Sequence, residues 1–199
     1  MKFAGAGLLA LPLCFAAYGA VRLVGRSDGH YGPGLDWTSG HVVNLVGLLL
    51  FVPALVALRR ALPPGRGRDA AVAVTFVGVV TSAVQFAVDV VAGLVAVDKA
   101  GMNEVTGRFA DLPGVRPVFY VVGPPLLYVG LLALTIMFVR AGVLAWWSPA
   151  LVLVGAGLTV VSLDLVPVAG ACLLVALAPL ARRLTEWLAP APRGAHARA

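Results

Sequence analysis

The sequence predicts an all-α, polytopic integral membrane protein with a single transmembrane domain over residues 1–188. Of the 199 residues, 60% are apolar and only 12% are charged, against about 45–50% and about 25% in soluble domains. The apolar residues form runs, most of which reach the roughly 20 residues that a helix needs to cross a bilayer. Most Lys and Arg residues lie at the ends of these runs, where they orient membrane helices.

Six apolar runs are separable, and each predicts one membrane-spanning helix: 3–24, 41–58, 70–97, 117–139, 142–163 and 165–183. The first run is followed by Arg22 and Arg26, as a retained helix would be. A signal peptide cleaved near Ala20 is the alternative. The second run begins just after Trp37, an aromatic residue typical of the membrane interface.

The third and fourth runs contain the most unusual residues. Asp89 is the only charged residue between residues 70 and 97. The fourth run contains Gly123-Pro124-Pro125, where the prolines remove backbone donors and disturb the helix. This predicts a kink that opens an outward-facing pocket, and a kink that serves packing alone is the alternative.

The fifth and sixth runs meet at Asp164 and are expected to form a tight helical hairpin, with a single re-entrant unit as the alternative. Asp164 lies three residues before Pro167, which predicts an N-cap for the last helix. Trp146 and Trp147 precede the fifth helix and fit an interfacial belt. The tail at 189–199 is expected to be disordered and cytoplasmic.

The basic residues predict that both termini lie on the cytoplasmic side. With the N-terminus inside, most Lys and Arg residues fall in the inner loops and tail, and the outer loops carry most of the Asp and Glu residues. An excess of basic residues marks the cytoplasmic side of bacterial and other membrane proteins.

Asp89 is the principal candidate for function, because an ionisable residue within a membrane-spanning helix is costly and is usually functional. Gly78, Ser82, Gln85 and Asp89 recur at helical spacing and therefore share one stripe. The stripe is expected to face the protein interior, since polar residues facing lipid would lack partners. Hydrogen bonding between packed helices is the alternative to a functional pocket.

Other polar residues are expected at the depth of Asp89, in the outer third of the membrane. They predict an outward-facing polar pocket between the second, third, fourth and sixth helices, below the loop that carries His30 and Asp36. The candidate catalytic residues are Asp89 as an acid, His41 and Asp164, and the candidate ligand-binding residues are Asn44, Ser82, Gln85 and Tyr120. A histidine and two carboxylates there suit an acid–base pair or a weak metal site. Ordinary interfacial and capping roles are the alternatives for His41 and Asp164.

Several functional classes lack their motifs. The sequence contains no P-loop, GxSxG, HExxH or CxxC motif, so we expect no cofactor and no resident metal. The net charge of +6 does not predict nucleic-acid binding, because the basic residues lie at the helix ends. The expected partners are membrane lipids, and beyond them a lipophilic small molecule or a partner membrane protein.

The stretch that runs from His41-Val-Val-Asn44 through Gly47 and Pro53 to Arg59-Arg60, with Gln85-Phe-Ala-Val-Asp89 after it, resembles uncharacterised small multi-pass membrane proteins common in actinobacteria. The resemblance covers most of the chain in layout. It implies a bacterial cytoplasmic (inner) membrane and supplies no activity.

Two classes of function follow. The first is a small carrier, or an accessory membrane subunit, with an outward-facing polar pocket. The second is an intramembrane enzyme acting on a lipophilic substrate with Asp89 as general acid. Terpene-cyclase-like chemistry is an analogy for the second class, because protonating an alkene needs little more than a carboxylic acid in an apolar cavity.

Overall fold

A computed structural model of the chain describes residues 4–27, 29 and 32–187, and these residues form helices and no strand. The predicted all-α class is confirmed. Five of the described helical segments are long and apolar enough to cross a membrane, which agrees with a multi-pass membrane protein.

The described elements follow one another along the chain with short connections. They are α1 (Ala4–Gly25), α2 (Leu35–Ala61), α3 (Arg66–Val95), α4 (Lys99–Ala110), the π-helix η1 (Arg116–Val122), α5 (Gly123–Arg140), α6 (Trp147–Val161), the 3₁₀-helix η2 (Leu163–Leu165) and α7 (Val166–Trp187).

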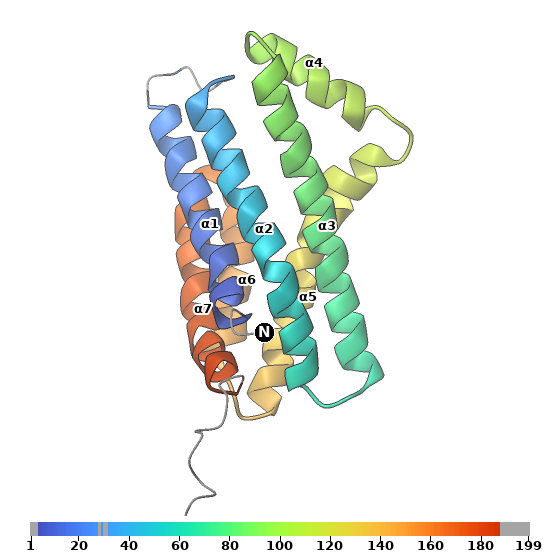
Figure 1. Cartoon of the computed structure of the whole chain (residues 1–199), viewed down its shortest axis with the longest axis vertical. Coiled ribbons are helices and arrows are strands. Elements are labelled where there is room, and N and C mark those ends of the chain that lie inside the picture. The colour runs from blue at the N-terminus through green and yellow to red at the C-terminus, as the bar shows by residue number, and fades with distance from the viewer. Residues whose placement is uncertain (1–3, 28, 30–31, 188–199) are drawn as a thin grey trace, which may run out of the picture.

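Among the described residues, five long helices and the shorter α6 form a closed ring. Each packs against two neighbours, in the order α1, α2, α3, α5, α6 and α7, and α7 returns to α1. Figure 1 shows that the start of α1 and the described end of α7 lie at the same end of the bundle, and that α4 extends sideways from the opposite end. We call these the terminal end and the α4 end.

The hydrophobic core fills the ring toward the terminal end. Phe51 and Leu55 of α2, Phe138 of α5, and Leu177 and Leu180 of α7 are all almost fully buried there. Their burial follows from the rule that apolar side chains of neighbouring helices interdigitate at crystal-like density. The opposite half of the ring is less completely filled, which leaves room for a site.

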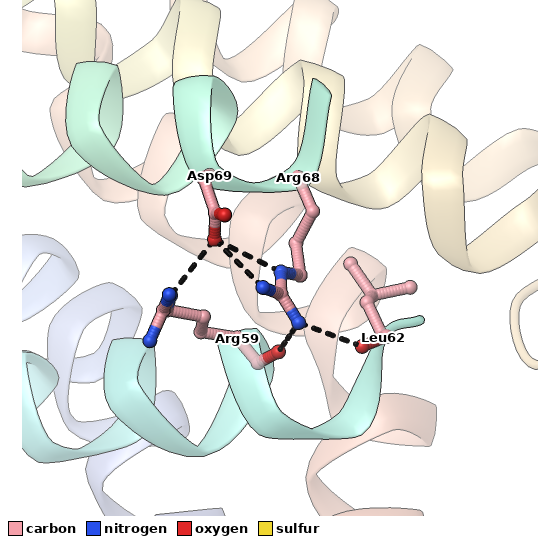
Figure 2. A network of polar contacts seen from close by, with 4 residues as sticks. All are labelled: Arg59, Leu62, Arg68 and Asp69. Atoms are coloured by element: carbon pink, nitrogen blue, oxygen red, sulfur yellow. Dashed lines mark hydrogen bonds and ion pairs between the residues drawn. The ribbon is translucent and has the colours of Figure 1, made fainter. Parts of the chain in front are cut away.

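A charged cluster joins α2 to α3 at the terminal end, as Figure 2 shows. Arg68 donates through Nε and Nη2 to Asp69 Oδ1, at 3.0 and 2.9 Å. Its Nη1 donates to the backbone carbonyls of Arg59 and Leu62 at 3.4 and 3.3 Å. The last carbonyls of a helix have no partner within it, so Arg68 caps α2 while it belongs to α3.

Several predicted boundaries were wrong. The second helix begins at Leu35 and not at residue 41, and the predicted 117–139 helix consists of η1 and α5. The predicted 142–163 helix is α6, which has only 15 residues and falls outside the five long apolar segments.

Helix α4 was not predicted at all. It is polar and begins at an N-cap, Asp98, whose Oδ1 accepts a hydrogen bond from the Gly101 amide at 2.8 Å. Asp164 does not cap the last helix as predicted, because it lies within η2, before α7 begins. Ser162 caps η2, with its hydroxyl accepting from the Asp164 amide at 3.1 Å. The tail predicted at 189–199 lies outside the described residues, as does His30.

Candidate functional site

A cavity of about 560 Å³ lies inside the ring of helices. Toward the terminal end, the wall of the cavity is continuous with the hydrophobic core and includes Leu48, Leu131 and Leu173. Toward the α4 end the wall becomes polar, with Asp89 and Tyr120. Cavities of about 300–1,000 Å³, mostly apolar and with a few placed polar groups, are typical of small-molecule sites.

The structure brings five of the seven candidate residues to this cavity. Asn44 comes from α2, Ser82, Gln85 and Asp89 come from α3, and Tyr120 comes from η1. Helical periodicity accounts for the α3 residues, because positions three and four apart share one face.

Gly78, the first residue of the predicted stripe, has a different environment. A Cβ on Gly78 would collide with the Leu127 backbone of α5. Likewise, a Cβ on Gly130 of α5 would collide with the backbone and hydroxyl of Thr75 on α3. Gly78 therefore lets α3 and α5 approach closely and leaves the polar positions beyond it to line the cavity.

Two polar atoms of the cavity wall have no hydrogen-bond partner in the part of the chain that the structure describes. Asn44 is only 3% exposed, and neither its Oδ1 nor the Tyr120 hydroxyl has a hydrogen-bond partner within the described residues. A buried polar group left unpaired costs about 1–3 kcal/mol. Both residues line the cavity, so a ligand there is in a position to satisfy them.

His41 does not line the cavity but contacts Asp89 directly behind it. His41 Nε2 lies 3.9 Å from Asp89 Oδ2, and both side chains are largely buried. The other ring nitrogen, Nδ1, lies 2.7 Å from the Trp37 carbonyl oxygen. A carbonyl accepts but does not donate, so Nδ1 carries a hydrogen and Nε2 is the nitrogen that faces the carboxyl group.

An aromatic shell fixes this pair. The Trp37 ring stacks on His41 at a centroid distance of 4.2 Å, and Tyr18 of α1 meets His41 edge-on at 5.1 Å. The Trp37 indole also donates from Nε1 to the Asp89 backbone carbonyl at 2.8 Å. Gly93, one turn further along α3, leaves the space that the indole occupies.

Two cationic side chains, Lys99 and Arg22, lie near the site at the α4 end. Lys99 Nζ lies 4.3 Å from the centroid of a Trp37 ring, a cation–π distance. Burial lowers the pKa of the Lys99 ammonium, the Asp89 carboxylate raises it, and Arg22 lowers it further. The side chain of Arg22 is itself only 14% exposed.

Asp164 is not part of the site. It does not line the cavity, and its Oδ1 accepts from Arg26 Nη1 at 2.6 Å and lies 3.6 Å from Arg22 Nη2. Among the described residues no group of three His, Cys, Asp or Glu side chains is arranged to hold a metal ion. Asp164, the second carboxylate of the predicted metal site, pairs with arginine instead.

The prolines of the fourth predicted helix line the cavity beside Asp89. Pro124 and Pro125 lie in the first turn of α5, which directly follows the π-helix. The Gly123 amide bonds to the Val118 carbonyl, five residues earlier, so the chain widens before the residues that lack an amide hydrogen. Wide turns of this kind occur often at functional sites.

The sequence did not indicate that α1 and α6 contribute to the wall. Phe15 and Tyr18 of α1, and Ala156, Thr159 and Val160 of α6, all line the cavity. Apart from Tyr18 and Thr159 these residues are apolar, and nothing distinguishes them from residues that face lipid. The closely spaced small residues of α6 were the only available signal.

No protein-family model, no curated protein and no solved structure matches this chain.

Proposed function

We propose that this chain is a small multi-pass membrane protein that binds a lipophilic small molecule inside its ring of helices and acts as its carrier. The observation that carries the proposal is the cavity, which is apolar over most of its wall and ends at the unpartnered Asn44 Oδ1 and Tyr120 hydroxyl. An accessory subunit that only packs against a partner has no need of such a cavity.

We also propose six membrane crossings with both termini in the cytoplasm. Helix α6 spans about 22 Å at 1.5 Å per residue, less than a hydrocarbon core of about 30 Å, but it packs between α5 and α7 in the ring. The terminal end carries the larger share of the arginines among the described residues, including Arg59, Arg140 and Arg182. The resemblance noted above suggests a bacterial cytoplasmic membrane.

An intramembrane enzyme is the second candidate, and the contact between His41 and Asp89 favours it. A carboxyl group beside an imidazole and next to an apolar cavity has the composition of an acid–base pair. The cavity-facing position of Asp89 would bring such an acid to a bound lipophilic substrate.

Pyrene, an apolar fluorophore, tests the carrier proposal. The protein is placed in nanodiscs, and the fluorescence change is compared with that of empty nanodiscs. Ala156→Phe fills the cavity and is expected to lower pyrene binding at least about 10-fold, which corresponds to 1.4 kcal/mol.

Ala150→Phe is the matched control, because Ala150 lies on the same helix, is exposed and does not line the cavity. It is expected to bind pyrene as the unmodified protein does. Equal loss in both variants, or no specific binding to the unmodified protein, rejects the proposal.

A further inference from the structure

The wall of the cavity differs between its two sides. The lining residues of α1, α2 and α3 are buried or half-buried. The exposed lining residues all belong to α5, α6 and η2, and among them Val129, Leu153 and Val160 are 55%, 62% and 86% exposed. These three side chains therefore touch both the cavity and the outer, apolar surface of the bundle.

The exposed lining residues mark an opening of the cavity toward the outer surface, beside the junction of α5 and α6. Of the six neighbouring pairs of helices, α5 and α6 have the least contact. The glycines that permit close approach face elsewhere, since Gly130 of α5 meets α3 and Gly155 of α6 meets α7. Gly157 of α6 lines the cavity, and a Cβ placed on it would have no atom within 4 Å.

The polar end of the cavity selects the chemistry of a ligand. Asn44 Oδ1 and the Asp89 carboxyl oxygens accept hydrogen bonds, and the Tyr120 hydroxyl both donates and accepts. A polar group that donates a hydrogen bond therefore satisfies them best. The nearby cations Arg22 and Lys99 oppose an ammonium group, and the Asp89 carboxyl opposes a carboxylate, which leaves a neutral hydroxyl.

We propose, on the basis of the function proposed above, that the cavity takes up a long-chain alcohol laterally from the lipid between α5 and α6, and holds its hydroxyl at Asn44 and Tyr120. The aliphatic chain lies along the apolar wall toward Leu131 and Leu173. The site thus recognises one donor group on an otherwise apolar molecule.

Radiolabelled dodecan-1-ol and its methyl ether, which lacks the donor, test the chemistry in nanodiscs. Asn44→Leu and Tyr120→Phe are each expected to lower dodecan-1-ol affinity about 5–10-fold, the effect of losing one hydrogen bond at a buried partner. Asn44→Leu is expected to leave ether affinity unchanged, because Asn44 Oδ1 only accepts and the ether has no hydrogen to donate. Tyr120→Phe is expected to weaken both ligands, because the Tyr120 hydroxyl can donate to either oxygen.

Thr135→Val is the matched control. Thr135 of α5 is buried but does not line the cavity, and its hydroxyl donates to the Leu132 carbonyl at 2.9 Å, so the affinity for dodecan-1-ol is expected to stay the same. Tighter binding of dodecylamine or dodecanoate than of dodecan-1-ol would overturn the assignment of an alcohol.

The access route is tested by the rate at which dodecan-1-ol displaces pyrene, measured by stopped-flow fluorescence. Gly157→Trp places a bulky side chain at the opening and is expected to slow displacement at least about 10-fold. Val160→Trp is a second variant in case the first does not fold. Val154→Trp is the control, because Val154 is 50% exposed on α6 and does not line the cavity.

The outcomes separate this inference from the proposed function. Failure of pyrene to bind rejects both. Pyrene binding with an equal effect of Asn44→Leu on alcohol and ether leaves a lipophile-binding protein and rejects the alcohol. Equal displacement rates in Gly157→Trp, Val160→Trp and Val154→Trp reject lateral access between α5 and α6.

Discussion

His41 on α2 presents Nε2 to Asp89 Oδ2 on α3 across 3.9 Å. Because its Nδ1 is held against the Trp37 carbonyl at 2.7 Å, the ring cannot turn to offer the other nitrogen without losing that bond. Two lone pairs facing one another in a poorly polarisable interior repel. The pair is therefore most stable with one proton on either Nε2 or Oδ2.

Asp89→Asn separates the carrier from the enzyme. An asparagine amide can donate to His41 Nε2 in place of a carboxyl proton, so we expect the protein to fold with a loss of about 1 kcal/mol or less and to keep its pyrene affinity within about threefold. A carrier leaves the cell's lipophilic compounds chemically unchanged. Mass spectrometry of lipid extracts is therefore expected to show the same compounds for both proteins.

A product that forms with the unmodified protein and disappears with Asp89→Asn would instead establish the enzyme. Asp164→Asn is the matched control, since Asp164 is a carboxylate at the same end of the bundle that pairs with Arg26 and does not line the cavity. Exposed ion pairs contribute little to stability, so this variant is expected to match the unmodified protein in extracts and in pyrene binding.

Membrane orientation is testable at two glycines that have open space around them. A Cβ at Gly65, between α2 and α3, or at Gly107, in α4, meets no atom within 4 Å. In a background without Cys14 and Cys172, Gly107→Cys is expected to react with a membrane-impermeant maleimide on intact cells. Gly65→Cys is expected to react only after the cells are opened, because the connection between α2 and α3 and helix α4 lie at opposite ends of the bundle (Figure 1). The reverse pattern would invert the proposed topology.

The helices and the polar stripe were predictable because they depend on local patterns. Apolar runs fix where α1, α2 and α3 lie, and the spacing of Ser82, Gln85 and Asp89 places them on one face whatever surrounds them. Helix α4 escaped prediction because it is short and polar, and the signal used was hydrophobicity.

The rest of the site depends on which helices become neighbours. The pairing of Asp164 with Arg26 joins residues 138 positions apart, and no local pattern reports such an approach. Likewise Phe15 of α1 and Ala156 of α6 line the cavity only because the ring closes through α7. An apolar residue facing a cavity and one facing lipid have the same sequence signature.

Arg68 is expected to stabilise the junction of α2 and α3. Arg68→Ala removes two hydrogen bonds to carbonyls of α2 and the contact with Asp69, and hydrogen bonds from charged donors contribute about 1.5–3 kcal/mol. We expect the melting temperature in detergent to fall by several degrees. Arg66→Ala, an exposed position on the same turn, is expected to leave it within about one degree. Equal melting temperatures would show that Arg68 does not cap α2.

Gly78 is expected to couple the packing of α3 and α5 to the cavity. Gly78→Ala gains about 0.5–1 kcal/mol of helix propensity, but its methyl group meets the Leu127 backbone of α5. Overpacking costs about 1–3 kcal/mol, and backbone yields less readily than a side chain, so a net loss of about 1–2 kcal/mol is expected in detergent unfolding. Gly107→Ala supplies the same propensity gain without a contact and is expected to stabilise α4.

Gly78→Ala and Gly107→Ala are also expected to differ in their affinity for pyrene. Gly78 lies one turn from Ser82 on the stripe that lines the cavity, and Leu127 lines it from the α5 side. Pushing these helices apart changes the width of the cavity between Ser82 and Tyr120, so Gly78→Ala is expected to lose pyrene affinity along with stability. Since α4 does not line the cavity, Gly107→Ala is expected to keep that affinity. If Gly78→Ala loses stability but binds pyrene normally, the α3–α5 contact supports the fold without shaping the site.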